Sequence, residues 1–99
     1  MNAKKRFRTI AELKAGINWW SKKLDIRPAQ IRVQPMKRKW ASCSTKGWIS
    51  FNTALIDKPR SFQNYAIVHE LIHLEIPNHG KLFKAMMNSC LLGWENFNG

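Results

Sequence analysis

The sequence predicts an α+β fold, in which a small antiparallel sheet packs against three helices within a single domain over residues 1–99. Three observations predict this class. Apolar residues recur at helical spacing near the N-terminus, short segments in the middle of the chain alternate apolar and polar residues, and two further helical patterns follow. At 99 residues the chain is long enough for one hydrophobic core but not for a separate substrate-binding domain.

The first helix is expected over residues 10–24. Thr9 and Glu12 have the spacing of a capping box, in which the hydroxyl and the carboxylate bind free backbone amides at a helix start. The apolar positions of this segment recur every three or four residues: Ile10, Leu13, Ile17, Trp20 and Leu24. The preceding residues 1–8 are rich in Lys and Arg, and we expect them to form a mobile basic arm.

The middle of the chain is expected to form the sheet. Ile31 and Val33 alternate with polar residues, which indicates a short half-buried strand. A second extended segment is expected over residues 36–44, and Ser44-Thr45-Lys46-Gly47 has the composition of a turn. Residues 48–52 alternate again, so the simplest arrangement is an antiparallel hairpin around this turn.

Two more helices are expected in the second half. One begins near Ser61, which is a suitable N-cap, and it continues until Pro77 interrupts the helical hydrogen bonding. Apolar residues surround so much of this helix that it must lie buried between other elements. The last helix is expected over residues 82–91, with Asn78 as a candidate cap and Gly93 near its end.

All three histidines of the chain lie in the helix that begins near Ser61 or just after it. His69 and His73 are four residues apart, which places both imidazoles on one helix face, and Glu70 lies beside them. This is the H-E-x-x-H pattern of zinc peptidases, in which two histidines bind Zn²⁺ and the glutamate takes a proton from the bound water. The motif therefore predicts one zinc ion, His69 and His73 as ligands, and Glu70 as the general base.

A zinc site of this kind needs a third protein ligand, and His79 is the first candidate. Pro77 ends the helix, so the chain can turn back and bring His79 towards the other two histidines. Glu95 is an alternative from another helix, and Glu75 is a less favoured one because it points to a different helix face. Cys43 could bind as a fourth ligand and make the site structural or latent; otherwise it is a small buried residue.

Several segments occur in an order that is typical of one protein family. They are Lys39–Ser44, Lys46-Gly47, Ile49–Asn52, Tyr65–Leu74 and Pro77-Asn78-His79. These segments resemble those of the YgjP-like metallopeptidase family, a relative of the WLM and SprT-like zinc proteases. The sequence departs from the family pattern at Lys39, Ala41 and Gly80. The resemblance implies a zincin-like zinc peptidase that acts on protein or peptide substrates.

Zincins commonly hold the substrate as an added strand along the sheet edge above the metal helix, because backbone pairing fixes an extended peptide. By this resemblance we expect the strand at residues 48–52 to be the edge, with Trp48, Ile49, Ser50 and Phe51 as substrate contacts. The alternative is an internal strand whose aromatic residues fill the core. Tyr65 is a candidate for stabilising the oxyanion, with core packing as its other role.

Basic residues are concentrated in the first part of the chain. The formal net charge is +11, and residues 1–40 contain twelve Lys and Arg against only Glu12 and Asp25. Such a surface attracts nucleic acid, an anionic membrane or acidic protein substrates, or it is a solvated face that keeps a small protein soluble. The candidate patch comprises Lys4, Lys5, Arg6, Arg8, Lys37, Arg38 and Lys39. It leaves two alternative functions open, a zinc-stabilised nucleic-acid-associated binding module and a DNA-linked protease of the SprT-like type.

Two further features bear on where the protein acts. No apolar run approaches the ~20 residues of a membrane span, and the basic N-terminal segment lacks the apolar stretch of a secretory signal. Cys43 and Cys90 are too few for a disulfide framework. We therefore expect a cytoplasmic protein without a membrane span.

Overall fold

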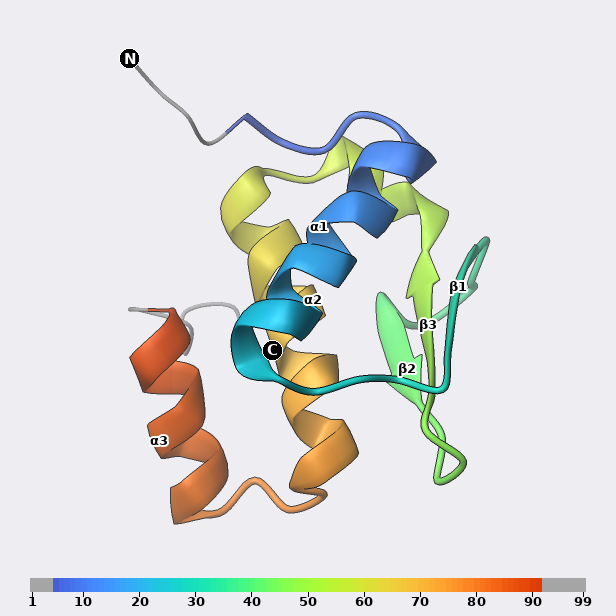
Figure 1. Cartoon of the computed structure of the whole chain (residues 1–99). Helices are drawn as coiled ribbons and strands as arrows, with labels where there is room; N and C mark the ends of the chain where they lie inside the picture. The colour runs from blue at the N-terminus through green and yellow to red at the C-terminus, as the bar shows by residue number, and fades with distance from the viewer. Residues whose placement is uncertain (1–4, 92–99) are drawn as a thin grey trace.

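Three helices stand beside one small sheet in the computed structural model, which describes residues 5–91 (Figure 1). The elements in chain order are α1 (Ile10–Leu24), β1 (Gln30–Gln34), β2 (Ala41–Cys43), β3 (Trp48–Asn52), the 3-10 helix η1 (Thr53–Asp57), α2 (Arg60–Glu75) and α3 (Lys81–Cys90). The predicted α+β class is confirmed, whereas η1 is an element that the sequence patterns do not predict. No helix in this part of the chain is long and apolar enough to cross a lipid bilayer.

The sheet is mixed, with the strand order β1-β3-β2. β3 pairs in parallel with β1 and antiparallel with β2, where Ser42 lies opposite Ser50. The predicted hairpin turn before β3 is present, with Gly47 at a φ of 85° and its amide donating to the Ser44 carbonyl at 3.1 Å. The antiparallel prediction is right for this hairpin and wrong for β1, because β3 inserts between two strands that run in opposite directions.

The start of α1 agrees with the sequence prediction. Thr9 Oγ1 accepts a hydrogen bond from the Glu12 amide at 3.1 Å, and Glu12 Oε1 accepts one from the Arg8 amide at 2.7 Å. The helix turns its buried residues towards the core: Leu13, Gly16, Ile17, Trp20 and Ser21. α1 therefore forms one wall of the core through the apolar stripe that its sequence shows.

Residues 5–8 are held against α2 and η1. The amide side chain of Gln63 in α2 is fully buried, and its Oε1 accepts from the Phe7 amide at 2.8 Å. Its Nε2 donates to the carbonyls of Phe7 at 2.9 Å and of Leu55 at 2.8 Å, and Arg6 Nε donates to the Ile56 carbonyl at 3.0 Å. The mobile basic arm stays a prediction, but residues 5–8 form hydrogen bonds to positions 50 and 56 residues away, and local composition gives no sign of these contacts.

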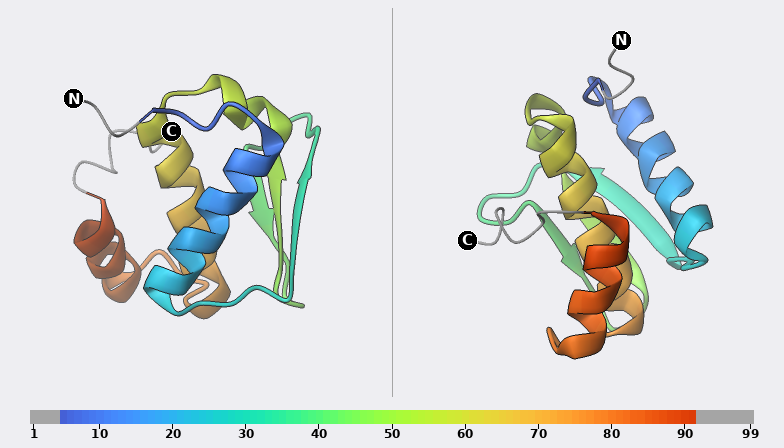
Figure 2. Two further views of the ribbon diagram at one scale, coloured as in Figure 1. Left: turned by 45° about the horizontal axis from the view of Figure 1, so that its top comes forward. Right: turned by 90° about the vertical axis from the view of Figure 1, so that its left-hand side faces the viewer.

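α2 joins the other parts of the fold, because it contacts α1, α3 and β2 (Figure 2). The predicted burial of this helix is confirmed, and its buried residues are Gln63, Ala66, Ile67, Val68, Leu71 and Ile72. The helix begins at Arg60 with Pro59 as its N-cap and without a side-chain cap, so Ser61 lies inside the first turn and is not the cap. Pro59 has a φ of −59°, and its fixed ring geometry already directs the chain into the helix.

α3 packs on α2 through Phe83 and Met87, which are both fully buried. Its N-cap is Gly80, two residues later than the predicted Asn78. The helix cannot begin earlier, because the connection after Pro77 carries the chain across from the end of α2. Gly93, the predicted end of this helix, lies outside the described residues.

Candidate metal centre and cleft

The end of α2 and the connection after it bring the three histidines together. His69 and His73 lie one turn apart on α2, with ring centroids 4.6 Å from each other. His79 lies in the connection to α3, and its ring centroid is 4.5 Å from that of His73 and 5.4 Å from that of His69. One ligand nitrogen from each ring lies within 4.8 Å of the other two. Among residues 5–91, no other three side chains of His, Cys, Asp or Glu form such a group.

The spacing of these nitrogens fits one metal ion. Zinc binds imidazole nitrogen at about 2.0–2.1 Å, so two nitrogens at a tetrahedral angle are about 3.4 Å apart. Nε2 of His73 and Nε2 of His79 are 2.8 Å apart, and no pair in the group exceeds 4.8 Å. The required spacing lies inside this range. Three imidazoles that leave one position for water are a donor set typical of catalytic zinc sites.

The other predicted ligands do not join this group. Glu75 and Cys43 both lie among the described residues, and neither belongs to the cluster. The Cys43 thiol donates instead to the Ser44 carbonyl at 3.7 Å. Glu95 lies outside the described residues. His79 is thus the third residue that the structure brings to His69 and His73.

Backbone and burial prepare His73 for metal binding. Its Nδ1 is 3.2 Å from the Ile76 carbonyl, so Nδ1 carries the proton and Nε2 keeps its lone pair. Ile76 has left the helical conformation, with φ −129° and ψ 96°, as expected before Pro77. Burial lowers the pKa of His73, and the neighbouring His69 lowers it further. Both effects favour the neutral imidazole, which is the form that binds a metal.

Phe83 of α3 supports all three imidazole rings. It is fully buried, and its ring centroid is 5.3 Å from that of His69 and 4.7 Å from those of His73 and His79. Close packing of this kind restricts the rotation of each ring. The sequence patterns identify Phe83 only as an apolar residue of the last helix, because its role at the site depends on how α3 packs on α2.

Glu70 lies beside the histidines in a largely buried position. Its Oε2 is 3.1 Å from Nδ1 of His69, and its side chain is 13% exposed. Burial raises the pKa of Cys43 and of Tyr65, and the negative charge of Glu70 raises both further. Both groups therefore remain protonated near neutral pH. The Tyr65 ring centroid is 5.3 Å from that of His69, and its role as an oxyanion donor stays a prediction.

A cleft of about 770 Å³ lies between α2 and β2. Its α2 wall contains His69, Glu70 and His73, and its other wall is formed by β2 and the turn after it: Ala41, Ser42, Cys43, Ser44 and Thr45. β2 is an outer strand that pairs with β3 on one side only. Its second edge has no strand partner among the described residues, so its backbone can pair with an extended chain.

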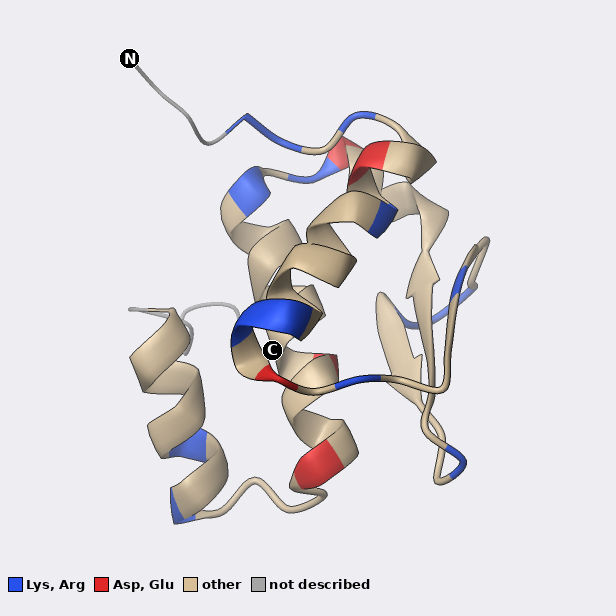
Figure 3. Cartoon of the chain, viewed as in Figure 1, with Lys and Arg blue, Asp and Glu red and all other residues tan. Residues whose placement is uncertain are grey.

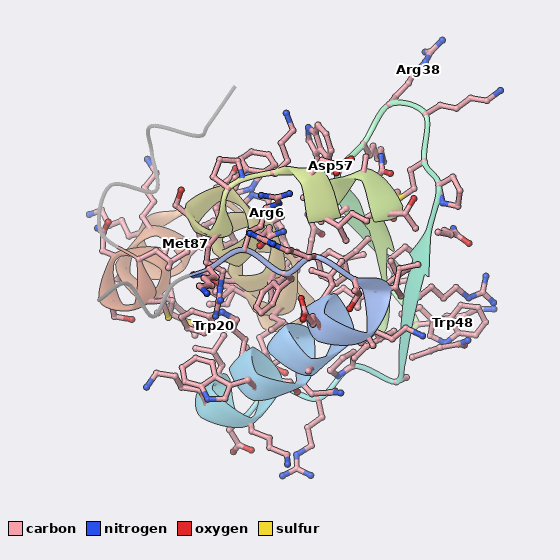
Figure 4. All side chains as sticks on the ribbon, turned by 90° about the horizontal axis from the view of Figure 1, so that it is seen from above. Arg6, Trp20, Arg38, Trp48, Asp57 and Met87 are labelled. Carbon is pink, nitrogen blue, oxygen red and sulfur yellow. The ribbon has the colours of Figure 1, made fainter. Side chains whose placement is uncertain are left out.

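The prediction that Trp48–Asn52 is the edge strand is wrong, because β3 lies in the centre of the sheet. Ile49 and Phe51 are fully buried, and Figure 4 shows Trp48 on the outer side of the sheet, away from the helices. None of Trp48, Ile49, Ser50 and Phe51 lines the cleft. The alternation of apolar and polar residues is the same in an edge strand and a central one, so this pattern could not distinguish them.

The basic residues of the predicted patch separate into two groups. Lys5, Arg6 and Arg8 lie near the start of α2, where they line a hollow of about 440 Å³ together with Asp57, Pro59 and Arg60. Lys37, Arg38 and Lys39 lie between β1 and β2, and Figure 4 shows Arg38 far from Arg6. Figure 3 shows Lys and Arg spread over several elements rather than in one stripe. Nucleic-acid binding stays a prediction, and Lys4 lies outside the described residues.

A histidine cluster on an H-E-x-x-H helix, within a small α+β domain, defines the class of this protein as a metallopeptidase. The model of the YgjP-like metallopeptidase domain matches residues 2–98. The chain therefore belongs to the YgjP-like metallopeptidase family. The prediction from its sequence motifs is confirmed.

Two solved structures share the fold. The crystal structure of the metallopeptidase zymogen jannalysin from Methanocaldococcus jannaschii has a TM-score of 0.75 and 30% identity, over 87% of this chain and 88% of that chain. The metallopeptidase zymogen abylysin from Pyrococcus abyssi has a TM-score of 0.70 and 22% identity, over 82% and 81% of the two chains. The second match supports the fold alone. No curated protein sequence matches the chain significantly.

Proposed function

We propose that the chain hydrolyses peptide bonds with one Zn²⁺ held by His69, His73 and His79, and with Glu70 as the general base. The observation that carries this proposal is the meeting of three imidazole nitrogens within 4.8 Å, next to a cleft that Glu70 also lines. Membership of a metallopeptidase family supports metal-dependent hydrolysis. A site of three imidazoles favours zinc over the harder cations that prefer oxygen ligands.

Each residue of the site has a separate task in this mechanism. Zinc, when bound, polarises the scissile carbonyl and makes the attacking water more acidic. Glu70 accepts the proton of that water and delivers it to the leaving amine. Its carboxylate lies 3.1 Å from His69 Nδ1 and is largely buried, so it is positioned before the substrate arrives. Phe83 and the Ile76 carbonyl keep the imidazoles in their orientations.

The unpaired edge of β2 is the proposed place for the substrate backbone. This edge lines the cleft opposite Glu70, and a peptide that adds to it as a further strand extends past the histidines. Backbone pairing binds an extended segment without demanding particular side chains. The proposed substrate is therefore a peptide or an unfolded protein segment, whose backbone is free to pair with β2.

Zinc analysis combined with cleavage of unfolded casein tests the proposal. Glu70→Gln is expected to keep one zinc per chain and to lose at least about 100-fold in turnover, because the base is absent. His79→Ala is expected to bind zinc much more weakly, because two imidazoles remain. Glu75→Gln is a matched control, since Glu75 lies on the same helix and lines the same cleft. It should leave the zinc content unchanged and keep turnover far above that of Glu70→Gln.

Three results would count against the proposal. Turnover of Glu70→Gln at the wild-type rate would reject Glu70 as the base. Full zinc content in His79→Ala would place the third ligand elsewhere, with Glu95 as the next candidate. Stoichiometric zinc without cleavage by any form of the protein would favour a zinc-stabilised binding module.

A further inference from the structure

The cleft carries an unbalanced positive charge at the end where β2 begins. Four charged side chains line it: Arg27, Lys39, Glu70 and Glu75. Lys39 precedes the first residue of β2, whereas Glu75 lies at the end of α2. β2 and the second half of α2 descend side by side in Figure 1, so these two charges lie towards opposite ends of the cleft.

The backbone that carries Lys39 is fixed. Nδ2 of Asn52 donates to the Lys39 carbonyl and to the Met36 carbonyl, both at 2.9 Å, and the Asn52 amide donates to the Trp40 carbonyl at 2.9 Å. Asn52 is 8% exposed, so these bonds are protected from water. The side chain of Lys39 therefore extends from a rigid position at the start of β2.

A second cation lies at the same end. Lys58 Nζ is 4.8 Å from the centroid of the Trp40 ring, and Trp40 directly follows Lys39 in the chain. Arg27, by contrast, lies close to a carboxylate, with its Nε 4.0 Å from Asp25 Oδ1, and Glu75 adds a second carboxylate to the cleft lining besides Glu70. The positive charges at the start of β2 have no such carboxylate partner among the ion pairs of the described residues.

We infer that Lys39 makes the peptidase select substrates with an acidic side chain on one side of the cleaved bond. This inference rests on the proposed function and on β2 as the substrate edge. Cys43 lines the cleft with Glu70 and is close enough to interact with its charge, so it marks the level of the proposed base on β2. Lys39 and Cys43 are four residues apart, which is roughly 13 Å of extended chain, so the acidic residue lies within about four positions of the bond. Lys39 is the specificity residue, and Lys58 adds to the local potential.

Cleavage of matched peptides tests this inference. Internally quenched peptides with one cleavable bond carry Glu, Gln or Lys at a single position, placed in turn on each side of that bond. The wild type is expected to cleave the Glu peptide about three-fold faster in kcat/KM than the Gln peptide and about ten-fold faster than the Lys peptide, on one side only. The preference should shrink in 0.5 M NaCl, because salt screens exposed charges.

Charge variants separate the local effect from that of net charge. Lys39→Glu is expected to reverse the order of the Glu and Lys peptides, and Lys39→Gln to abolish the difference. Lys14→Glu is the control, because it changes the net charge equally from an exposed position on α1, which does not line the cleft. It should preserve the wild-type order.

The experiment distinguishes failure of the Lys39 inference from failure of the proposed function. If the Gln peptide is cleaved but Glu and Lys peptides are cleaved equally well, the inference is wrong and the proposed function stands. If Lys39→Glu and Lys14→Glu change the preference between the Glu and Lys peptides equally, the preference comes from net charge and the role of Lys39 is wrong. If no peptide is cleaved, the proposed function fails and this inference fails with it.

Discussion

Gly16 offers a test of how residues 5–8 are held, because its expected mutational effect depends on one neighbour. A Cβ atom at Gly16 would lie 2.3 Å from Cζ of the Phe7 ring, closer than any stable contact. The backbone of Phe7 cannot move away to make room, because Gln63 binds both of its backbone groups, so the ring itself must rotate out of its place. The Arg60 guanidinium also lies 4.0 Å from the ring centroid. Gly16→Ala should therefore expel the Phe7 ring from its place.

The size of the effect follows from two opposing terms. Alanine in a helix interior is about 1 kcal/mol more favourable than glycine. Loss of most of the contacts of the partly buried Phe7 ring costs about 2–3 kcal/mol. Gly16→Ala should thus destabilise the wild-type protein by about 1–2 kcal/mol. In a Phe7→Ala background no ring obstructs the new methyl group, and the same substitution should stabilise by about 1 kcal/mol.

Urea unfolding of the four proteins measures this cycle. The midpoints and slopes give the free energy of unfolding for the wild type, each single variant and the double variant. The expected coupling between the two positions is about 2–3 kcal/mol, with a change of sign for Gly16→Ala. Stabilisation by Gly16→Ala in both backgrounds would mean that Phe7 does not pack on α1, and the account of residues 5–8 would be wrong.

Three other predictions concern buried polar groups and a thiol. Gln63→Leu removes three hydrogen bonds to backbone atoms, and it should lower the free energy of unfolding in urea by about 3 kcal/mol. Asn52→Asp keeps the shape of the side chain but loses two donated bonds to carbonyls, so thermal unfolding should show a loss of about 2–3 kcal/mol. Burial raises the pKa of the Cys43 thiol, and the negative charge of Glu70 raises it further. In a Cys90→Ser background, Glu70→Gln should therefore speed iodoacetamide labelling of Cys43 at pH 8, measured by mass spectrometry. No change in the labelling rate would show that the charge of Glu70 does not reach this thiol.

Local sequence patterns predicted the elements whose cause is local. The capping box of Thr9 and Glu12 and the apolar stripe of α1 depend on residues three and four positions apart, so the sequence contains the relevant information. The same is true of His69 and His73, whose meeting on one face is a property of any helix. The bend after Ile76 likewise follows from the proline that comes next.

Other features of the fold depend on contacts between residues far apart in the sequence, which local patterns cannot predict. The central place of β3 depends on pairing with β1 and β2 together, and residues 48–52 alternate in the same way whether one or both edges are paired. The binding of Phe7 by Gln63 joins positions 56 residues apart. The support of the imidazoles by Phe83 similarly requires that α3 lies against α2. Each of these facts belongs to a pair of elements rather than to one segment.

Asn52 shows how a residue outside the cleft determines its geometry. Its side chain binds two carbonyls of the connection that leads into β2, and its Oδ1 accepts from the Ala54 amide at the start of η1, which leads into α2. β2 and α2 are the two walls of the cleft, so this one side chain fixes the segments that precede both walls. The histidines, by contrast, lie on α2 and in the connection that follows it, and Phe83 supports their rings. A change at Asn52 should therefore alter how a substrate aligns along the proposed β2 edge while the histidine cluster stays intact, because the two walls and the histidines have separate supports.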